Sequence, residues 1–573
     1  MRHRFSYLLI AILVLGCFYP SIFAESLSID DLQMIQGYLN SASLDWQGLF
    51  WPSSSPYYYR PFLGLTFYWD HIFFDNHGSI AHLENILLHL ATTIFLYGIL
   101  RHFVITPAKN DWPLLVALFF GIHPLTTEPV NWISGRTDLL AGFFVLASFL
   151  LFLWNREKKM WRYCLAAFLF LCGLWSKEVA IGLLPVIFFT CLQEENFAIK
   201  QKWRSITSRI LPFLAATILY GVMRAGGHIG HDIGVMTAIH GGHGTEPFTF
   251  SIKFMSLIKA IGFYSQKILW PFPLNFAIVE INRPVALAVG ITVLTCLTLA
   301  LLFYRHRPFM LGIVWIFCFL APALPVAVNY IAWTPMAERY LYLPLMGLCL
   351  VMTILLDKSP PKKIITVFML LLLFGFGTAT AQRNIVWQKN ITLWRDVVEK
   401  SPNFAPGHND YAIALMREGK KEEAEKQLAI AESLAVGSGK SRIQGNIMAL
   451  DGDVERQSIG LDAILEKEQQ PKLRKEILYK AIRLISNELI HNEMKNESRI
   501  NWTRKLLSYQ KELATLDKNP YHQYRIGQLH LALEEKVAAQ AAFAVTCQTS
   551  SDYFTQPACT LAKRLKEEIK GKL

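Results

Sequence analysis

The chain has 573 residues, of which 53% are hydrophobic and 17% are charged, whereas ordinary soluble domains carry roughly 25% charged residues. The formal net charge is +12, but the positive charge lies largely in short loops between apolar runs and on a C-terminal stretch of mixed sign, which excludes a nucleic-acid-binding surface as its explanation. Residues 1–384 are mainly apolar and residues 385–573 are rich in charge, so the chain combines a membrane part with a water-soluble part.

Apolar runs recur throughout residues 1–384, and about 20 apolar residues cross a bilayer as a helix. The first run follows Arg2 and Arg4, and we expect it to remain as an uncleaved anchor. The expected fold class is therefore all-α: a polytopic membrane helix bundle followed by a helical domain. The eleven predicted spans lie near residues 5–24, 80–100, 112–123, 138–154, 161–175, 178–192, 209–224, 285–304, 308–328, 340–356 and 362–380.

Loops rich in Lys and Arg alternate with loops that have few, and the rich loops are expected on the cytoplasmic side. The N-terminus is then cytoplasmic. Residues 251–280 interrupt the alternation, because this hydrophobic segment carries Lys253, Lys259 and Lys267; we predict a re-entrant or surface-lying helix there. The last span then leads outward, which places residues 385–573 in the periplasmic or extracytoplasmic space beside a cell's inner membrane.

Within the water-soluble part, residues 405–434 form two amphipathic segments around Gly419, and residues 519–547 repeat this arrangement. Both resemble a tetratricopeptide repeat, a helix-turn-helix unit of about 34 residues. One unit cannot bury its apolar face alone, so we expect a short array of about three. Such an array binds peptides or partner helices, or packs as a cap on the membrane domain. Cys547 and Cys559 could form a disulfide if this domain lies outside the cytoplasm.

An acidic pair, Asp30 and Asp31, follows the first span and opens a loop over residues 25–79. Adjacent carboxylates at a membrane surface could supply a general base or hold a cation. Alternatively, Asp31 could cap the helical run at residues 32–39.

Three predicted outward span ends each combine a cation with a carboxylate. Charges at such positions are costly and often functional, although a single Lys or Arg can also be a simple interfacial anchor. Their convergence on one side of the membrane favours a site. The three combinations are Arg136 with Asp138, Lys177 with Glu178, and Arg339 with Glu338.

A glycine-rich loop at residues 225–246 contains several histidines, which are zinc ligands in many proteins. Because glycine orders none of them in advance, metal binding is the weaker hypothesis here. The candidate ligands are His228, His231, His240 and His243.

Several short motifs follow one another in a specific order after the acidic pair. Together they resemble the transmembrane and tetratricopeptide-repeat O-mannosyltransferases and their bacterial relatives, in the glycosyltransferase C superfamily. The resemblance covers nearly the whole chain, and the departures are a short repeat array and the histidine-rich loop. The motifs lie at residues 59–62, 65–67, 82–89, 123–130, 135–140, 176–178 and 337–344.

The resemblance implies an inverting transferase that moves a sugar from a polyprenyl phosphate to a Ser or Thr hydroxyl of an exported protein. It implies Asp30, with Asp31 second, as the general base. A divalent metal is optional in this superfamily. Cations would stabilise the leaving phosphate, and the candidates are Arg339, Lys177, Arg136 and Arg60. The candidate supporting residues are Glu338, Glu178, Asp138, His123, Glu128 and His89.

Two other functions remain open. One is a ligase that moves a larger lipid-linked glycan and shares the membrane architecture. The other is a non-enzymatic transporter or scaffold whose repeat domain recruits partners, although transporters usually show internal duplication and charges near the midplane.

Overall fold

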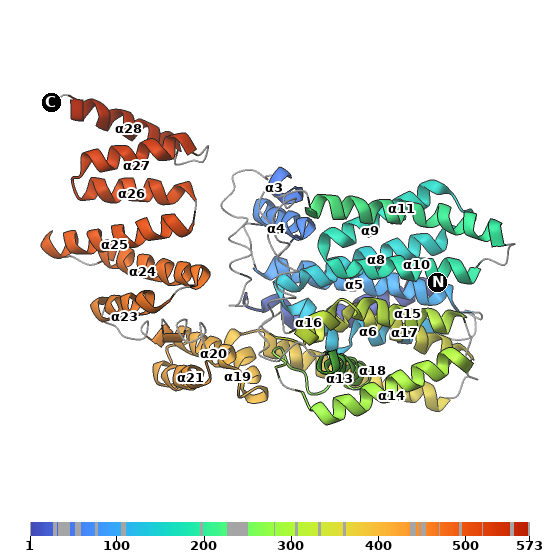
Figure 1. Cartoon of the computed structure of the whole chain (residues 1–573). Helices are drawn as coiled ribbons and strands as arrows, with labels where there is room; N and C mark the ends of the chain where they lie inside the picture. Colours follow the sequence, from blue (N-terminus) through green and yellow to red (C-terminus); the bar gives the residue numbers. More distant parts are fainter. Residues whose placement is uncertain are drawn as a thin grey trace. The chain divides into compact units, whose positions relative to one another are not determined.

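A computed structural model gives the fold as a set of helices joined by turns and loops (Figure 1). Within the described part of the chain, the only β-structure is an isolated bridge between Ile278 and Met336, which confirms the all-α class. The described residues are 2–26, 31, 46–51, 59–74, 78–104, 111–194, 199–225, 250–279, 281–303, 307–329, 334–358, 363–435, 443–444, 446–447, 454–468, 470–491, 496–517, 519–549 and 555–570.

The chain divides into two compact units, Met1–Pro402 and Asn403–Leu573. The sequence placed this boundary after residue 384, within the helix that ends at Trp387. The helices of the first unit are α1 (Arg2–Phe18), α3 (Trp46–Phe50), α4 (Pro61–Phe74), α5 (Gly78–His102), α6 (Trp112–Gly121), α7 (Thr127–Asn131), α8 (Arg136–Trp154), α9 (Met160–Ser176), α10 (Leu183–Glu194), α11 (Ile199–Ala225), α13 (Phe250–Leu269), α14 (Arg283–Phe303), α15 (Arg307–Leu320), α16 (Ala323–Asn329), α17 (Tyr342–Lys358), α18 (Lys363–Trp387) and α19 (Asn390–Lys400).

Six helical segments among the described residues are long and apolar enough to cross a membrane. A bent pair, α6 with residues 124–131, makes up to seven, and shorter apolar helices lie at Met160–Ser176, Glu178–Gln193, Arg283–Leu299 and Pro308–Leu320. Each of the eleven predicted spans overlaps one of these segments. The chain is an integral multi-pass membrane protein. The six long segments are Arg4–Phe23, Gly78–His102, Ile133–Trp154, Trp203–Ala225, Glu338–Asp357 and Lys363–Trp387.

Close helix crossings hold the first unit together. At the crossing of α15 and α17, a Cβ added to Gly312 would lie 2.9 Å from the carbonyl oxygen of Gly347, and the reverse distance would be 2.7 Å. Both positions require glycine for this approach, as at many helix interfaces in membranes where small residues let backbones meet. A large apolar core runs through α1, α5, α6, α8, α9, α17 and α18.

The second unit consists of antiparallel helices stacked side by side (Figure 1). Gly419 adopts φ +76° between the first two, a left-handed conformation that favours glycine. Both predicted helix-turn-helix units are present, and three further described helices, two of them longer, lie between them in the chain. The helices are α20 (Ala405–Arg417), α21 (Lys421–Leu434), α23 (Val454–Lys467), α24 (Pro471–His491), α25 (Asn496–Leu516), α26 (Pro520–Ala532), α27 (Lys536–Thr549) and α28 (Thr555–Lys570).

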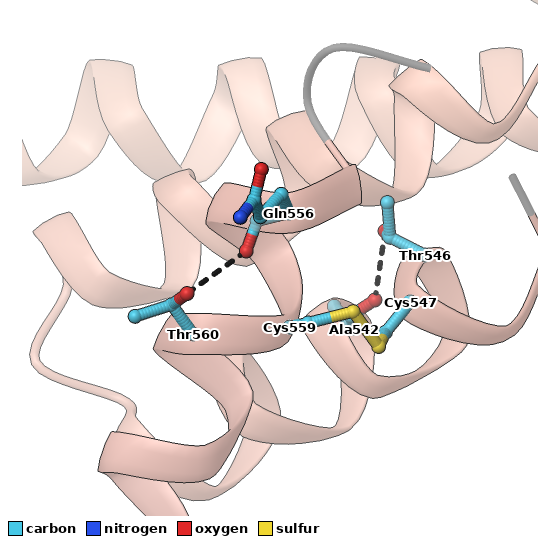
Figure 2. The surroundings of a disulfide bond; sticks show 6 residues. All are labelled: Ala542, Thr546, Cys547, Gln556, Cys559 and Thr560. Carbon is cyan, nitrogen blue, oxygen red and sulfur yellow. Dashed lines mark hydrogen bonds between the residues drawn. A yellow bond between two sulfur atoms is a disulfide. The ribbon is translucent and has the colours of Figure 1, made fainter. Parts of the chain in front are cut away.

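A disulfide between Cys547 and Cys559 joins the last two helices (Figure 2). Near it, the Thr546 hydroxyl donates to the carbonyl of Ala542 at 3.1 Å. The helices also share an apolar cluster that includes Phe543. The pairing considered from the sequence is thus present in the structure.

Candidate functional site

The candidate site is built around the broken segment between α6 and α8. Here α6 and the following helical residues, 124–131, are bent by 46°. Pro124 and Pro129 have no backbone N–H and disrupt a continuous helix. A 3-10 turn at Ile133–Gly135 then leads into α8. Irregular backbone inside an apolar bundle needs polar partners from neighbouring segments, and the side chains of this segment make those contacts.

Glu128, in α7, fixes the position of Arg339, which lies in the 3-10 turn before α17. Its two carboxylate oxygens accept hydrogen bonds from the Arg339 backbone N–H at 2.9 Å and from Nη1 at 2.5 Å. The Arg339 guanidinium carbon also lies 5.0 Å from the ring centroids of Trp132 and Tyr340, within cation–π range. These contacts hold the guanidinium in one orientation, as forked recognition of an anion requires.

Lys177, directly after α9, pairs with Asp138 in the first turn of α8. Its Nζ lies 2.6 Å from Asp138 Oδ1 and 5.5 Å from the centroid of the Tyr340 ring. It is also close enough to Arg60 and Arg339 for repulsion between their charges. Side chains from three separate stretches of sequence therefore meet here.

Glu178 extends this group to a partly exposed end. Its carboxylate accepts hydrogen bonds from Arg224 Nη1 at 2.9 Å and from Arg60 Nη2 at 3.4 Å. Arg224 also donates to the Tyr220 hydroxyl at 2.7 Å. The side chains of Arg60, Glu178 and Arg224 are 15%, 34% and 28% exposed, so this end of the group is partly open to its surroundings.

We call this connected set the cation cluster. In their ordinary charge states, its four cations and three carboxylates leave one excess positive charge. Like charges held together in a partly desolvated place are repulsive, and an anionic ligand relieves that repulsion. The members are Arg60, Lys177, Arg224 and Arg339, with Glu128, Asp138 and Glu178.

Arg136 is close to this group along the chain but binds other partners. Its Nη1 lies 2.8 Å from Asp70 Oδ2 and 2.9 Å from Glu84 Oε2. Nε donates to Asn85 Oδ1 at 3.1 Å, and Nη2 donates to the carbonyl of Ala81 at 3.1 Å. Arg136 thus ties α4, α5 and α8 together; its role as a phosphate ligand stays a prediction.

Asp31, the described member of the acidic pair, is buried against the same broken segment. Its Oδ1 accepts hydrogen bonds from the backbone N–H of Ser134 at 2.9 Å and from the Ser134 hydroxyl at 2.7 Å. Ser134 stands in the chain between Trp132, which stacks on Arg339, and Asp138. The loop after the first span therefore reaches the segment that carries the cation cluster.

Glu338 forms an ion pair with a buried cation, Lys267. In the sequence, Lys267 was noted only because its segment interrupts the alternation of loops rich and poor in Lys and Arg. Lys267 Nζ lies 2.8 Å from Glu338 Oε1 and donates to the carbonyls of Pro271 and Pro273. The same Oε1 accepts from the backbone N–H of Asn275 at 2.9 Å. Lysines within a largely hydrophobic segment were the signal for this pair.

His89 and His123 both make contacts that fix helix ends. The His89 ring nitrogens lie 2.9 Å from the Tyr342 hydroxyl and 3.0 Å from the Gly121 carbonyl oxygen, which links α5, α6 and α17. His123 Nδ1 accepts from the backbone N–H of Leu125 at 3.2 Å. Both histidines are buried, and their contacts lie at the end of α6 and the start of the broken segment.

None of the three cation–carboxylate combinations at the span ends forms an ion pair within itself. Residues one or two apart on a helix face different directions, so each cation reaches a carboxylate from another element. The observed partners are Asp70 and Glu84 for Arg136, Asp138 for Lys177, and Glu128 for Arg339, while Glu178 binds Arg60 and Arg224, and Glu338 binds Lys267.

Two predictions fall on segments outside the described residues: the base Asp30, and the zinc candidates His228, His231, His240 and His243. Among the residues that are described, no group of three or more His, Cys, Asp or Glu could hold a metal ion.

Three known proteins are similar to this chain over about two thirds of its length. Protein O-mannosyl-transferase TMTC1 of Homo sapiens is 26% identical over 431 residues, which cover 64% of this chain and 47% of that protein. Protein O-mannosyl-transferase F38B6.6 of Caenorhabditis elegans is 24% identical over 394 residues, 65% of this chain and 53% of its own length. Protein O-mannosyl-transferase TMTC3 of Mus musculus is 22% identical over 407 residues, 64% and 43% respectively.

The chain is related to the TMTC protein O-mannosyl-transferase family. This confirms the resemblance noted in the sequence. The chain spans about half the length of the curated TMTC relatives that it matches. No family model matches it.

Proposed function

We propose that this protein is a glycosyltransferase that moves a sugar from a polyprenyl-phosphate donor to a hydroxyl of an exported protein. The relatives' names give the reaction type, protein O-mannosyl transfer. The observation that carries the donor assignment is the cation cluster. Its excess positive charge at the ends of apolar helices suits an anionic phosphate attached to a membrane lipid.

The proposed reaction is a direct displacement at the anomeric carbon. The acceptor oxygen forms a bond to this carbon, the bond between the carbon and the phosphate oxygen breaks, and the electron pair leaves with the polyprenyl phosphate. The acceptor's proton passes to a carboxylate. A single displacement inverts the anomeric configuration. Arg339, Lys177 and Arg60 stabilise the leaving phosphate, so no acid is needed to protonate it.

The acidic pair supplies the base in this proposal. An alcohol is a weak nucleophile at neutral pH, and a carboxylate within hydrogen-bond reach of its proton raises the rate by about 10²–10⁴-fold. Ser134 donates two hydrogen bonds to one oxygen of Asp31 and so fixes the orientation of that carboxylate. Asp30, its neighbour, is the first candidate from the family resemblance.

The orientation is part of the proposal. Loops rich in Lys and Arg would face the cytoplasm, and the site would open on the opposite side of the inner membrane. The disulfide between Cys547 and Cys559 supports an extracytoplasmic repeat unit, because such bonds persist in oxidising compartments. There the repeat unit would meet exported proteins and could bind the acceptor.

The test uses the full-length protein in lipid nanodiscs, a polyprenyl-phosphate sugar and an exported acceptor protein, with the glycosylated product measured by mass spectrometry. Asp30→Asn and Asp31→Asn are each expected to abolish transfer, while membrane insertion persists. Glu157→Gln is a suitable control, because this carboxylate is 58% exposed and pairs only with a surface lysine among the contacts described.

Full activity in both single variants and in the double variant would exclude the acidic pair as the base. Transfer of a large lipid-linked glycan, with no transfer from a monosaccharide donor, would identify the ligase instead. A protein that transfers neither, and that retains partner binding after both substitutions, would be a scaffold.

A further inference from the structure

Asp138 has one oxygen that the proposed mechanism does not use. The residue is 4% exposed, and its Oδ1 accepts a hydrogen bond from Lys177 Nζ at 2.6 Å. Its Oδ2 is buried and has no hydrogen-bond partner within the described part of the chain. A carboxylate only accepts hydrogen bonds, and a buried acceptor without a donor destabilises the protein. This oxygen is therefore suited to a ligand that donates a hydrogen bond.

The position of Asp138 restricts the chemistry of that ligand. Its carboxylate belongs to the cation cluster, where it binds Lys177 and attracts Arg339. A phosphate oxygen would be repelled by a carboxylate and would bind the cations instead. The partner of Oδ2 is then an uncharged donor attached to the anion, and the group joined to the donor's phosphate is a sugar that carries hydroxyls.

We infer that Asp138 Oδ2 accepts a hydrogen bond from the hydroxyl on the carbon next to the anomeric carbon of the transferred sugar. This inference rests on the proposed function, because that function puts a sugar phosphate at the cation cluster. The hydroxyl is the one nearest to the phosphate linkage on the ring. Asp138 is thus a specificity-determining residue, distinct from the base at Asp31.

Such a contact also fits the energetics of glycosyl transfer. Positive charge develops at the anomeric carbon in the transition state, and hydrogen bonds to the neighbouring hydroxyl strengthen there. A site built to receive a substrate hydroxyl strongly rejects the analogue that lacks it, because its buried polar atom then stays unpaired. Lys177 holds Asp138 in place and also contacts the phosphate, so this ion pair contacts both the sugar and the phosphate of the donor.

The experiment compares the intact donor with donors that each lack one ring hydroxyl. For the wild-type protein, kcat/KM is expected to fall by about 100-fold or more for the donor that lacks the hydroxyl next to the anomeric carbon. We compare the ratio of kcat/KM for the intact donor to kcat/KM for the deoxy donor. In Asp138→Asn and Asp138→Ala this ratio is expected to shrink to within a few-fold of one. Because the ratio is compared between variants, the intrinsic reactivity of the deoxy donor cancels.

Lys177→Gln is the matched comparison. It removes the cation on the other side of the same ion pair, so kcat/KM should fall for the intact and the deoxy donor alike, and their ratio should stay near the wild-type value. If Asp138 only positions Lys177, then Asp138→Asn will behave in the same way. A wild-type ratio retained in Asp138→Asn overturns the inference.

Binding provides a second readout if Asp138→Asn transfers no sugar. The affinities for the sugar-bearing lipid and for the bare polyprenyl phosphate are measured in nanodiscs. The inference expects Asp138→Asn to weaken binding of the first but not of the second, whereas parallel changes for both lipids overturn it. A wild-type protein that transfers sugar without discriminating between the donors also overturns it. If the wild-type protein neither transfers sugar nor binds either lipid, the proposed function itself fails.

Discussion

The ion pairs of the two units differ in how much of their side chains is exposed. In the membrane unit, the side chains of Arg136 and Asp70 are 0% and 6% exposed. In the repeat unit, those of Lys475 and Asp517 are 38% and 21% exposed. A buried pair is stable only while both partners are present, whereas an exposed pair contributes little because water solvates both charges.

This difference separates two uses of charge. The repeat unit is stabilised by apolar contacts between neighbouring helices, such as the cluster around Leu478 and Leu513, and its charges serve mainly as a solvated surface. The membrane unit places charges inside an apolar bundle, where each is costly. Such charges often mark functional sites, and several of the buried ion pairs lie around one broken segment.

The largest effect should come from breaking the buried pair. Arg136→Gln leaves Asp70 and Glu84 without their cation, and the loss of one partner of a buried pair typically costs about 3–5 kcal/mol. The free energy of unfolding, measured by SDS titration of the purified protein, should fall by that amount. Lys475→Gln is the control from the exposed group and should change it by less than about 1 kcal/mol. Equal effects of both substitutions would contradict the distinction between the units.

The disulfide should have the next largest effect. Replacement of Cys547 and Cys559 by Ser frees a loop with a sequence separation of 12, and loss of such a cross-link typically costs about 2–4 kcal/mol. The urea concentration at which protease cleaves the repeat unit of the full-length protein should fall. Cys164→Ser, at an exposed free cysteine, should leave it unchanged. An unchanged midpoint in the double variant would mean that apolar packing of α27 and α28 is sufficient.

The smallest expected effect is the dependence of the repeat unit's stability on pH. Burial lowers the pKa of His522 in the folded protein, so at mildly acidic pH the unfolded chain binds more protons than the folded one. Stability should therefore fall as the pH drops below about 6.5, the ordinary histidine value. His522→Gln should flatten this part of the pH profile, measured as the urea midpoint between pH 5 and 8.

The groups around His522 set the size of this dependence. Asp517 favours its charged form, Lys475 opposes it, and the neutral side chains of Tyr479 and Gln510 contact its ring. Burial raises the pKa of Asp517, but hydrogen bonds from Lys475 and Tyr479 dominate and lower it. Stability linked to Asp517 is therefore lost only at a pH below about 4, outside the window tested. A pH profile that His522→Gln leaves unchanged would assign the acid sensitivity to other groups.

The fold class was accessible from the sequence because it depends on local features. Apolar runs of membrane-spanning length mark the spans, and Gly419 with its flanking amphipathic segments marks a helix-turn-helix unit. The bend between α6 and α8 was less accessible. Pro124 and Pro129 indicate a break, but not that the broken segment would become the centre of the charged groups.

The site could be predicted from the sequence only in part, because it depends on contacts between residues that are distant in the chain. Lys177 and Arg339 were singled out by their position at span ends and Arg60 by the family resemblance, and the three do lie in one cluster. Arg224 was not among the candidates, and Lys267 was noted only as an interruption of the charge pattern, because their partners, Glu178 and Glu338, are distant in the chain. No pattern in one sequence indicates such pairing.

The amino-acid sequence by itself determined which segments are helical, which are apolar enough for a membrane and which residues are charged at the ends of spans. These properties follow from composition and short-range periodicity. Only the tertiary structure decided which carboxylate each cation binds, which residues Asp31 contacts, and that Asp138 keeps one buried oxygen without a donor among the described residues. Electrostatic pairing depends on distance in space, and helix packing, rather than separation along the chain, sets that distance.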